Sequence, residues 1–343
     1  MKMKKNIISM IAMAIIGTAT GENTFCQPNT KLRPDKTVFL YQKETKTISD
    51  PVQGKVTEAL GLEMTENNGL TGAENIPENG NIGNISEDVR FDLYFPKKPN
   101  GQMVVVCPGG GYSIVSSYNE GVYVADWMLS QGITVAVLKY RLPNNHWEVP
   151  LTDVQNTFRY CRENAEKWGI SQIGIMGFSA GGHLAASATT LYTDKVTRPD
   201  FSVLIYPVIA IDNTPSHRGT RVNLIGNDEK WTSTEGKSAE EWLEDQKTYN
   251  ELIHKYSLQN QVTSDTPPVF LAHCSDDQTV PVINSILFYN RLIENGVSAE
   301  MHIYPSGGHG WGFSMSKYVP TDRIEYARKE FLASLGRWLT QQR

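Results

Sequence analysis

A Gly-Phe-Ser-Ala-Gly sequence at residues 177–181 is the segment whose residue types and spacing point most clearly to chemistry. It lies between a short apolar run, residues 173–176, and an Ala-rich segment of helical composition. This is the strand, turn and helix context that exposes a nucleophilic serine. Such a tight turn leaves no room for β-carbons beside the serine, and glycine occupies both flanks. Ser179 is therefore predicted to be a nucleophile, since a chance occurrence of the pattern would not explain this context.

A serine nucleophile needs a general base, and His309 fits that role. It stands in a Gly-Gly-His-Gly sequence at residues 307–310, directly after a strand-like run at 299–304. A glycine-flanked histidine on a loop at the end of a strand can reach the serine, as the order serine, acid, histidine requires. Other histidines fit less well because they lie within a strand, in the helix after the serine or in polar connecting segments: His302, His183, His146, His217 and His254.

Two neighbouring carboxylates, Asp276 and Asp277, follow the apolar strand at residues 269–273. A carboxylate in this loop would accept a hydrogen bond from Nδ1 of His309 and stabilise the imidazolium that forms during catalysis. Adjacent side chains point in different directions, so only one of the two can serve. The pattern of the residues by itself leaves both open.

A glycine-rich loop supplies candidates for an oxyanion hole. The buried strand predicted at residues 103–107 runs directly into Pro-Gly-Gly-Gly-Tyr at 108–112. Without side chains in the way, the N–H groups of Gly110 and Gly111 can face a developing alkoxide together with the N–H of Ala180. The rival interpretation, a phosphate-binding loop, lacks the Gly-Lys-Ser/Thr sequence that should follow.

These segments, together with several shorter ones, resemble the acetylxylan esterase-like carbohydrate esterases of the α/β-hydrolase family, which are related to the hormone-sensitive-lipase group. The resemblance runs through residues 104–112, 139–143, 175–186, 206–208, 262–268 and 273–312. It implies removal of O-acetyl groups from xylan-type plant polysaccharide, or its oligosaccharides, through an acyl-enzyme and without a cofactor. It also implies Asp277 as the acid, because this residue precedes x-x-Val-Pro in the family's loop.

Two aromatic residues beside these motifs are candidates for contact with the substrate. Trp311, two residues after His309, has an indole face that suits the apolar face of a pyranose, although simple packing would also explain it. Tyr112 closes the glycine-rich loop. Three other functions are kept as alternatives: a feruloyl or other aryl esterase, a secreted peptidase and a catalytically silent carbohydrate-binding relative.

The composition is that of an enzyme domain without a nucleic-acid partner. The 343 residues are 40% hydrophobic with a formal charge of −5, so there is no basic excess to bind phosphates. A chain of this length can bury on the order of three-quarters of its unfolded surface. Outside the N-terminal leader, the cysteines Cys107, Cys161 and Cys274 form no C-x-x-C pair, so neither a disulfide framework nor a cysteine metal site is expected.

The first 27 residues are predicted to be a signal peptide. Lys2, Lys4 and Lys5 precede an apolar run at residues 7–17, which is too short to span a bilayer. The mature protein is therefore expected to be secreted or periplasmic, with no transmembrane segment. Lipid attachment at Cys26 is the less favoured alternative, since Phe25 is not the small residue that such a signal prefers. The sequence leaves the oligomeric state open.

Residues 28–343 are predicted to form a single α/β domain, with a mostly parallel sheet and helices on both faces. Strands are expected at 103–107, 133–138, 173–176, 201–206, 269–273 and 299–304, and helices at 120–130, 153–168, 179–191, 281–295 and 321–339. Two regions interrupt this alternation. Residues 28–87 are expected to be a polar arm with the first antiparallel strands. Residues 212–265 are an insertion, either a lid over the site or a surface excursion whose Trp231 and Trp242 pack on its own helices.

Overall fold

The computed structural model describes residues 30–315, 317–319 and 322–343. The predicted signal peptide and the alternative lipid site at Cys26 lie outside these described residues. Within the described part of the chain, no helix is both long and apolar enough to cross a membrane.

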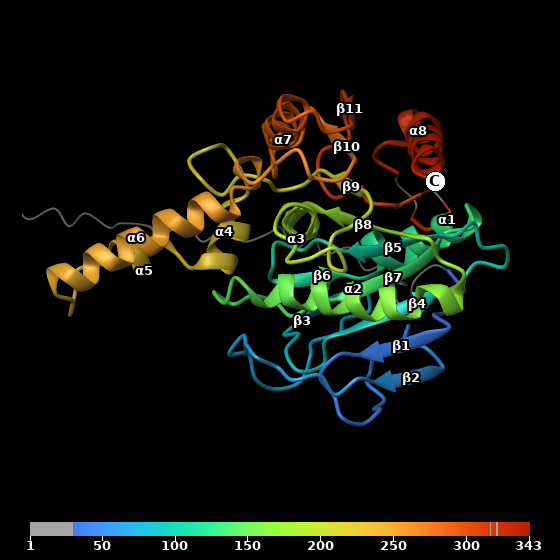
Figure 1. Ribbon diagram of the computed structural model, residues 1–343, viewed down its shortest axis with the longest axis horizontal. Coiled ribbons are helices and arrows are strands. Elements are labelled where there is room, and N and C mark those ends of the chain that lie inside the picture. The colour runs from blue at the N-terminus through green and yellow to red at the C-terminus, as the bar shows by residue number, and fades with distance from the viewer. Residues whose placement is uncertain (1–29, 316, 320–321) are drawn as a thin grey trace, which may run out of the picture.

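A large twisted sheet forms the centre of the molecule (Figure 1). In the described chain its strand order is β11-β10-β9-β8-β5-β7-β4-β1-β2. Neighbours from β11 to β7 are parallel, whereas β4 runs antiparallel to both β7 and β1. The bounds are β1 Lys36–Phe39, β2 Val56–Ala59, β4 Arg90–Tyr94, β5 Gln102–Cys107, β7 Thr134–Lys139, β8 Gln172–Phe178, β9 Ser202–Ile205, β10 Val269–Cys274 and β11 Ala299–Tyr304. The predicted α/β sheet and its six predicted strands are confirmed.

Helices cover both faces of this sheet because its central strands are apolar on both sides. In β5, Met103 and Val105 face one hydrophobic cluster, while Val104 and Val106 face the other. The first cluster includes residues of α2 (Val149–Trp168), α3 (Ser179–Thr190) and α7 (Ile283–Glu294). The second includes residues of α1 (Tyr123–Ser130) and α8 (Arg328–Gln341). The carboxyl ends of the parallel strands therefore lie at one edge of a fully covered sheet.

Two helix boundaries differ from the prediction. The helix expected from residue 153 begins at Val149, because Pro150 has the fixed φ of a first helical turn. The helix expected from residue 321 begins at Arg328, after a 3₁₀ turn at Glu325–Ala327. Apolar periodicity alone did not show where this last helix starts.

The polar arm at residues 28–87 contributes to the interior as well as the surface. Its strands β1 and β2 extend the sheet, and its Asp50 forms buried ion pairs with Arg90 of β4, at 3.0 Å, and with Lys139 of β7. Lys139 also bonds Asp92 at 2.6 Å. Charged residues of the arm therefore hold it to the sheet, which corrects the expectation of a purely superficial arm. A small second sheet joins β3 (Asn81–Gly83) to β6 (Ile114–Ser116), just beyond the glycine-rich loop.

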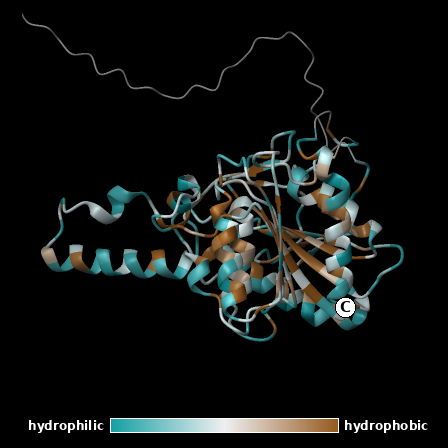
Figure 2. Cartoon of the chain, turned by 90° about the horizontal axis from the view of Figure 1, so that it is seen from above, coloured by the Kyte–Doolittle hydropathy of each residue, from teal (hydrophilic) through white to brown (hydrophobic). Residues whose placement is uncertain are grey.

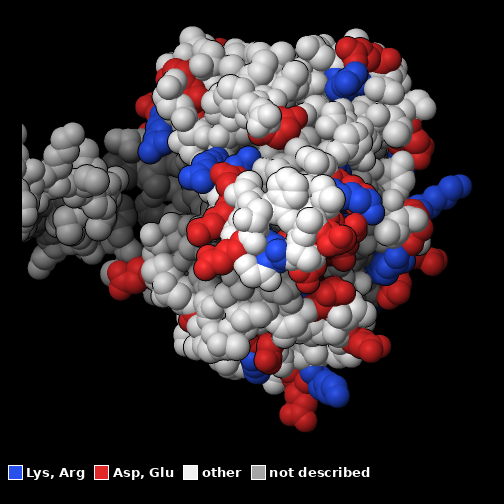
Figure 3. Space-filling view, turned by 90° about the vertical axis from the view of Figure 1, so that its left-hand side faces the viewer, with Lys and Arg blue, Asp and Glu red and all other residues white. Residues whose placement is uncertain are grey.

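The insertion at residues 212–265 contains α4 (Arg218–Ile225), α5 (Asp228–Thr232) and α6 (Ala239–Tyr256). Helices α5 and α6 project from the body of the molecule, and their surfaces are mostly hydrophilic (Figures 1 and 2). Trp231 is buried against Tyr249, and Trp242 donates to the carbonyl of Thr232 at 3.4 Å. The tryptophans thus pack within the insertion, as the second of the two interpretations expected. Acidic and basic side chains are mixed on the face in Figure 3, with no broad basic patch.

Candidate active site

Ser179 stands at the junction of β8 and α3, at the carboxyl edge of the sheet. Its φ of +52° is a left-handed conformation, which is rare for a residue with a side chain and typical of a strained elbow. A β-carbon on Gly177 would lie 2.2 Å from the carbonyl oxygen of Gly181, and one on Gly181 would lie 2.2 Å from that of Cys107. Both flanking glycines are therefore required by the close approach of strand and helix.

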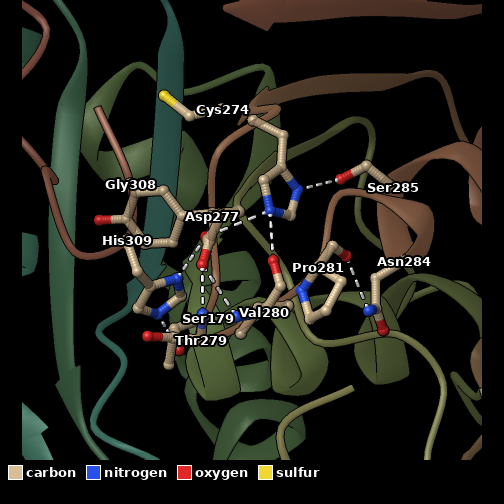
Figure 4. A network of polar contacts seen from close by, with 12 residues as sticks. Ser179, Cys274, Asp277, Thr279, Val280, Pro281, Asn284, Ser285, Gly308 and His309 are labelled. Carbon is tan, nitrogen blue, oxygen red and sulfur yellow. Dashed lines mark hydrogen bonds and ion pairs between the residues drawn. The ribbon is translucent and has the colours of Figure 1, made fainter. Parts of the chain in front are cut away.

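The structure brings Ser179, His309 and Asp277 into one hydrogen-bonded chain (Figure 4). Nε2 of His309 lies 2.8 Å from Oγ of Ser179, and Nδ1 lies 2.6 Å from Oδ2 of Asp277. Because a carboxylate only accepts, Nδ1 carries the proton in the neutral ring, and Nε2 is free to accept the serine proton. Asp276 instead accepts the N–H groups of Gly307 and Gly308, so it shapes the histidine loop and does not contact the ring.

The carboxylate of Asp277 is surrounded by donors. Oδ1 accepts from the N–H groups of Thr279 and Val280, each at 2.9 Å. Burial favours the neutral acid, but hydrogen bonds from His273 and His309 hold the pKa of Asp277 well below its usual range. Asp277 is therefore ionised at neutral pH, as a partner of an imidazolium should be.

His273 is a member of this cluster that the sequence analysis did not identify. Its Nε2 lies 3.3 Å from Oδ2 of Asp277 and 2.9 Å from the carbonyl of Val280, while Nδ1 faces Oγ of Ser285 at 2.8 Å. Both neighbours of Nε2 are acceptors, so that nitrogen carries the proton. The available sequence signal was its place at the end of a strand, four residues before the acid.

The glycine-rich loop presents the donors expected of an oxyanion hole. Gly110 and Gly111 have φ values of +130° and +63°. The carbonyl of Gly110 accepts from Ser113 and Ile114, and that of Gly111 accepts from the Asn223 side chain at 2.8 Å. By contrast, the N–H groups of Gly110, Gly111 and Ala180 donate to no backbone acceptor in the described chain. The loop is held in place while these donors stay unused.

Comparison with known proteins identifies the family. The BD-FAE family model matches residues 91–292, more than half of the chain. This chain belongs to the BD-FAE family. An acetylxylan esterase from Xylanibacter ruminicola is 38% identical to it over 263 residues, 75% of this chain and 49% of the relative. Endo-1,4-beta-xylanase B from Butyrivibrio fibrisolvens is 32% identical over 225 residues, 60% of this chain and 32% of the relative. The BD-FAE chain thus spans half or less of these curated relatives.

Solved structures resemble the BD-FAE chain over most of their own length. An acetyl ester-xyloside bifunctional hydrolase from Caldicellulosiruptor lactoaceticus is 33% identical with a TM-score of 0.60, covering 74% of this chain and 88% of that one. A sugar hydrolase from Lactococcus lactis is 28% identical with a TM-score of 0.59, covering 75% and 96%. The predicted carbohydrate-esterase resemblance, the α/β-hydrolase fold and the enzyme class, a carboxylic ester hydrolase, are confirmed.

The two aromatic residues expected to contact the substrate are buried in this BD-FAE chain. Trp311 is 1% exposed and packs between the rings of Tyr206 and Phe331, with centroids 4.9 and 5.1 Å away. Tyr112 is 2% exposed and bonds Nδ1 of His183 through its hydroxyl at 3.0 Å. Neither ring offers a face to a sugar, so their expected substrate contacts are wrong. Apolar packing against other aromatic residues accounts for both.

His217 lies beside the glycine-rich loop, although its sequence context indicated only a connecting segment. A β-carbon on Gly111 would lie 3.3 Å from its Cε1. Nδ1 accepts the N–H of Thr220 at 3.1 Å, so the neutral ring carries its proton on Nε2. Burial and the nearby His309 lower the pKa of His217, which favours this neutral form. His217 also lines a cleft of about 290 Å³ formed by residues 210–218 and Arg221.

Among the described residues, no group of three or more His, Cys, Asp or Glu side chains is arranged to hold a metal ion. Cys107, Cys161 and Cys274 are free and buried, and burial raises the pKa of each thiol. Cys161 packs in the hydrophobic core, as its place on an apolar helix face predicted.

Proposed function

We propose that this chain is a secreted serine esterase that removes O-acetyl groups from xylan-type polysaccharide or its oligosaccharides. The observation that carries the proposal is the continuous hydrogen-bonded chain from Ser179 through His309 to Asp277, beside N–H groups that have no protein acceptor. The names of the relatives, an acetylxylan esterase and an acetyl ester-xyloside hydrolase, support the acetyl and xylan specificity. Secretion rests on the signal-peptide pattern of residues 1–27.

The first half of the reaction forms an acetyl-enzyme. Nε2 of His309 accepts the hydroxyl proton as Oγ of Ser179 attacks the ester carbonyl. The N–H groups of Gly110, Gly111 and Ala180 bind the resulting oxyanion, and each such donor is typically worth about 10²–10³ in turnover. Asp277 stabilises the imidazolium. The carbon–oxygen bond to the sugar then breaks, and His309 donates its proton to the departing sugar oxygen.

The second half releases acetate. His309 accepts a proton from a water molecule as the water oxygen attacks the acetyl carbonyl on Ser179. The new tetrahedral intermediate uses the same backbone donors. Its collapse returns the proton to Oγ of Ser179 and frees acetate, which regenerates the starting hydrogen-bonded chain. One water is consumed for each ester bond, and no cofactor takes part.

The sugar portion of the substrate would lie in the cleft at residues 210–218. The cleft begins at His217, which lies against the oxyanion loop, and its other lining groups include Asn213 and Ser216. With Nδ1 occupied by Thr220, the Nε2–H of His217 is a fixed donor for a sugar oxygen next to the ester. This assigns to a loop the role that was expected of Trp311.

Acetate release from acetylated xylo-oligosaccharides tests the function, measured beside hydrolysis of methyl ferulate. The wild type and Ser179→Ala are compared, with Ser233→Ala on the projecting insertion as a matched serine control. We expect acetate release from the wild type and the control, and a loss of about 10⁴–10⁶ in Ser179→Ala. Turnover of ferulate alone would support an aryl esterase. Inactivity on both substrates would return the peptidase and the binding relative to consideration.

A further inference from the structure

Glu120 is a buried carboxylate next to the site that the reaction described above does not use. It lies in the short π-helix Tyr118–Val122 and is 4% exposed. Its Oε2 accepts the N–H of Gly109 at 2.7 Å, and its Oε1 accepts the hydroxyl of Tyr206 at 2.8 Å. Within the described residues, no Lys or Arg forms an ion pair with it. A buried carboxyl group without a cation is costly and needs an explanation.

The arrangement of donors fits the ionised form of Glu120. Tyr206 accepts the N–H of Gly312 at 2.7 Å, so its own hydroxyl hydrogen is directed to Oε1. Oε2 faces a backbone N–H, which can only donate. Both carboxylate oxygens therefore meet donors, and a proton on either would displace one of them. Burial raises the pKa of Glu120, while the donors and the nearby His309 act in the opposite direction.

The contacts of Glu120 join the two loops that carry the proposed chemistry. Gly109 directly precedes the oxyanion donors, and Gly312 lies three residues after His309. The linking residue, Tyr206, follows β9 with a φ of +38°, and its ring lies 4.8 Å from that of His309. A β-carbon on Gly109 would lie 2.9 Å from both Oε2 of Glu120 and Cβ of Ser179. Only the backbone of Gly109 thus separates the carboxylate from the nucleophile.

We propose that Glu120 is a positioning residue of the catalytic site: it fixes the oxyanion loop through Gly109, fixes the histidine loop through Tyr206 and Gly312, and stabilises the His309 imidazolium with its negative charge. This inference rests on the proposed function. The strained conformation of Tyr206 persists because bonds at both ends of its hydroxyl and packing on His309 hold it.

Several other groups act on His309, so the charge of Glu120 must be separated from theirs. Asp277 binds Nδ1, His217 lies within electrostatic range, and Tyr206 packs on the ring. Asp276 and Arg323 contact the backbone of the histidine loop. Tyr140, which lies near Glu120, stays neutral because burial raises the pKa of its hydroxyl well above the usual value. Glu120→Gln removes one negative charge, keeps the shape of the side chain and leaves these groups in place.

The test is the pH dependence of kcat/KM for p-nitrophenyl acetate, after wild-type acetyl esterase activity and its loss in Ser179→Ala are established. Glu120→Gln should lower the plateau about tenfold and move the acid limb to lower pH by about half a unit, since the imidazolium loses a stabilising charge. Tyr206→Phe keeps the carboxylate, so it should lower the plateau without moving the limb downward. Glu235→Gln, at an exposed carboxyl of the insertion, should reproduce the wild type.

Two results would overturn the inference while leaving the esterase function intact. One is a Glu120→Gln profile that coincides with the wild type. The other is a loss by the same factor at every pH, which a merely structural role would give. If thermal unfolding shows that Glu120→Gln does not fold, the decision passes to Tyr206→Phe, whose unchanged plateau would overturn the positioning role. An inactive wild type would instead overturn the proposed function.

Discussion

His273 and His309 share one oxygen of Asp277: Nε2 of His273 lies 3.3 Å from Oδ2, the atom that accepts from Nδ1 of His309 at 2.6 Å. The first histidine is buried and the second partly exposed. His273 therefore helps to fix the carboxylate in the orientation that His309 needs.

Replacing His273 tests this shared contact. His273→Phe removes the donor to Asp277 and leaves the carbonyl of Val280 without its partner. We expect a loss of about 1–3 kcal/mol in the free energy of unfolding and about a tenfold fall in kcat, measured by urea unfolding and acetate release. Ser285→Ala removes only the outer partner of the ring and should have the smaller effect. Equal effects of the two variants would contradict the role given to His273.

The two adjacent aspartates should differ sharply in their effect on turnover. Asp277→Asn places an amide donor against Nδ1 of His309 and favours the wrong tautomer, so kcat should fall about 10⁴-fold. Asp276→Asn keeps an oxygen acceptor for Gly307 and Gly308 and should cost less than about tenfold, since it acts only on the loop. Steady-state rates of both variants on the same ester decide the question, and a reversed order would move the acid to Asp276.

The elbow should tolerate no side chain at Gly181. Its β-carbon would meet the carbonyl oxygen of Cys107 at 2.2 Å, so Gly181→Ala should destabilise the protein by about 1–3 kcal/mol and abolish most activity. Gly336→Ala, in the interior of α8, is the matched control, because its nearest contact is an ordinary 3.7 Å. That change should be neutral or stabilise by up to about 1 kcal/mol. Thermal unfolding of both variants distinguishes crowding from a general intolerance of alanine.

Stability should fall on acidification because of His183. Burial lowers the pKa of this ring to about 4, and it contacts the hydroxyl of Tyr112 and the carbonyl of Tyr256. The unfolded chain, with an ordinary value near 6.5, binds more protons between about pH 4 and 6.5, so the free energy of unfolding rises with pH there.

Urea unfolding at pH 7.5 and 4.5 measures this contribution. His183→Gln should remove about 2–3 kcal/mol of the difference between the two pH values, at about 1.4 kcal/mol for each pKa unit. His254→Gln, at an exposed histidine of α6, is the control and should keep the wild-type slope. An unchanged slope in His183→Gln would assign the acid sensitivity to other groups.

His217 should affect binding of the sugar more than the chemistry. His217→Ala removes the Nε2–H that faces the cleft, so KM for an acetylated oligosaccharide should rise about tenfold while kcat/KM for p-nitrophenyl acetate changes little. Thr220→Ala removes the hydroxyl that orients the ring but retains the backbone N–H, and should give a weaker form of the same pattern. Equal losses on both substrates would place His217 in the chemical step.

Much of the site followed from local sequence because its requirements are local. The elbow needs glycines beside Ser179, and the loop before Tyr112 needs glycines for its positive φ values. His309 could be selected because the ends of parallel strands share one edge of the sheet. The apolar periodicity of α2 also survived folding, since one face of that helix is buried in the core.

What the sequence determined by itself was the family, the order of strands and helices, and the positions of Ser179 and His309, because these depend on near neighbours in the chain. Tertiary structure alone decided that Asp277 meets His309, that Trp311 is buried, and that α5 and α6 project away from the body. It also decided that Glu120, His217 and His273 surround the site. Their positions depend on contacts between segments far apart in the chain, and periodicity carries no information about which distant segments will meet.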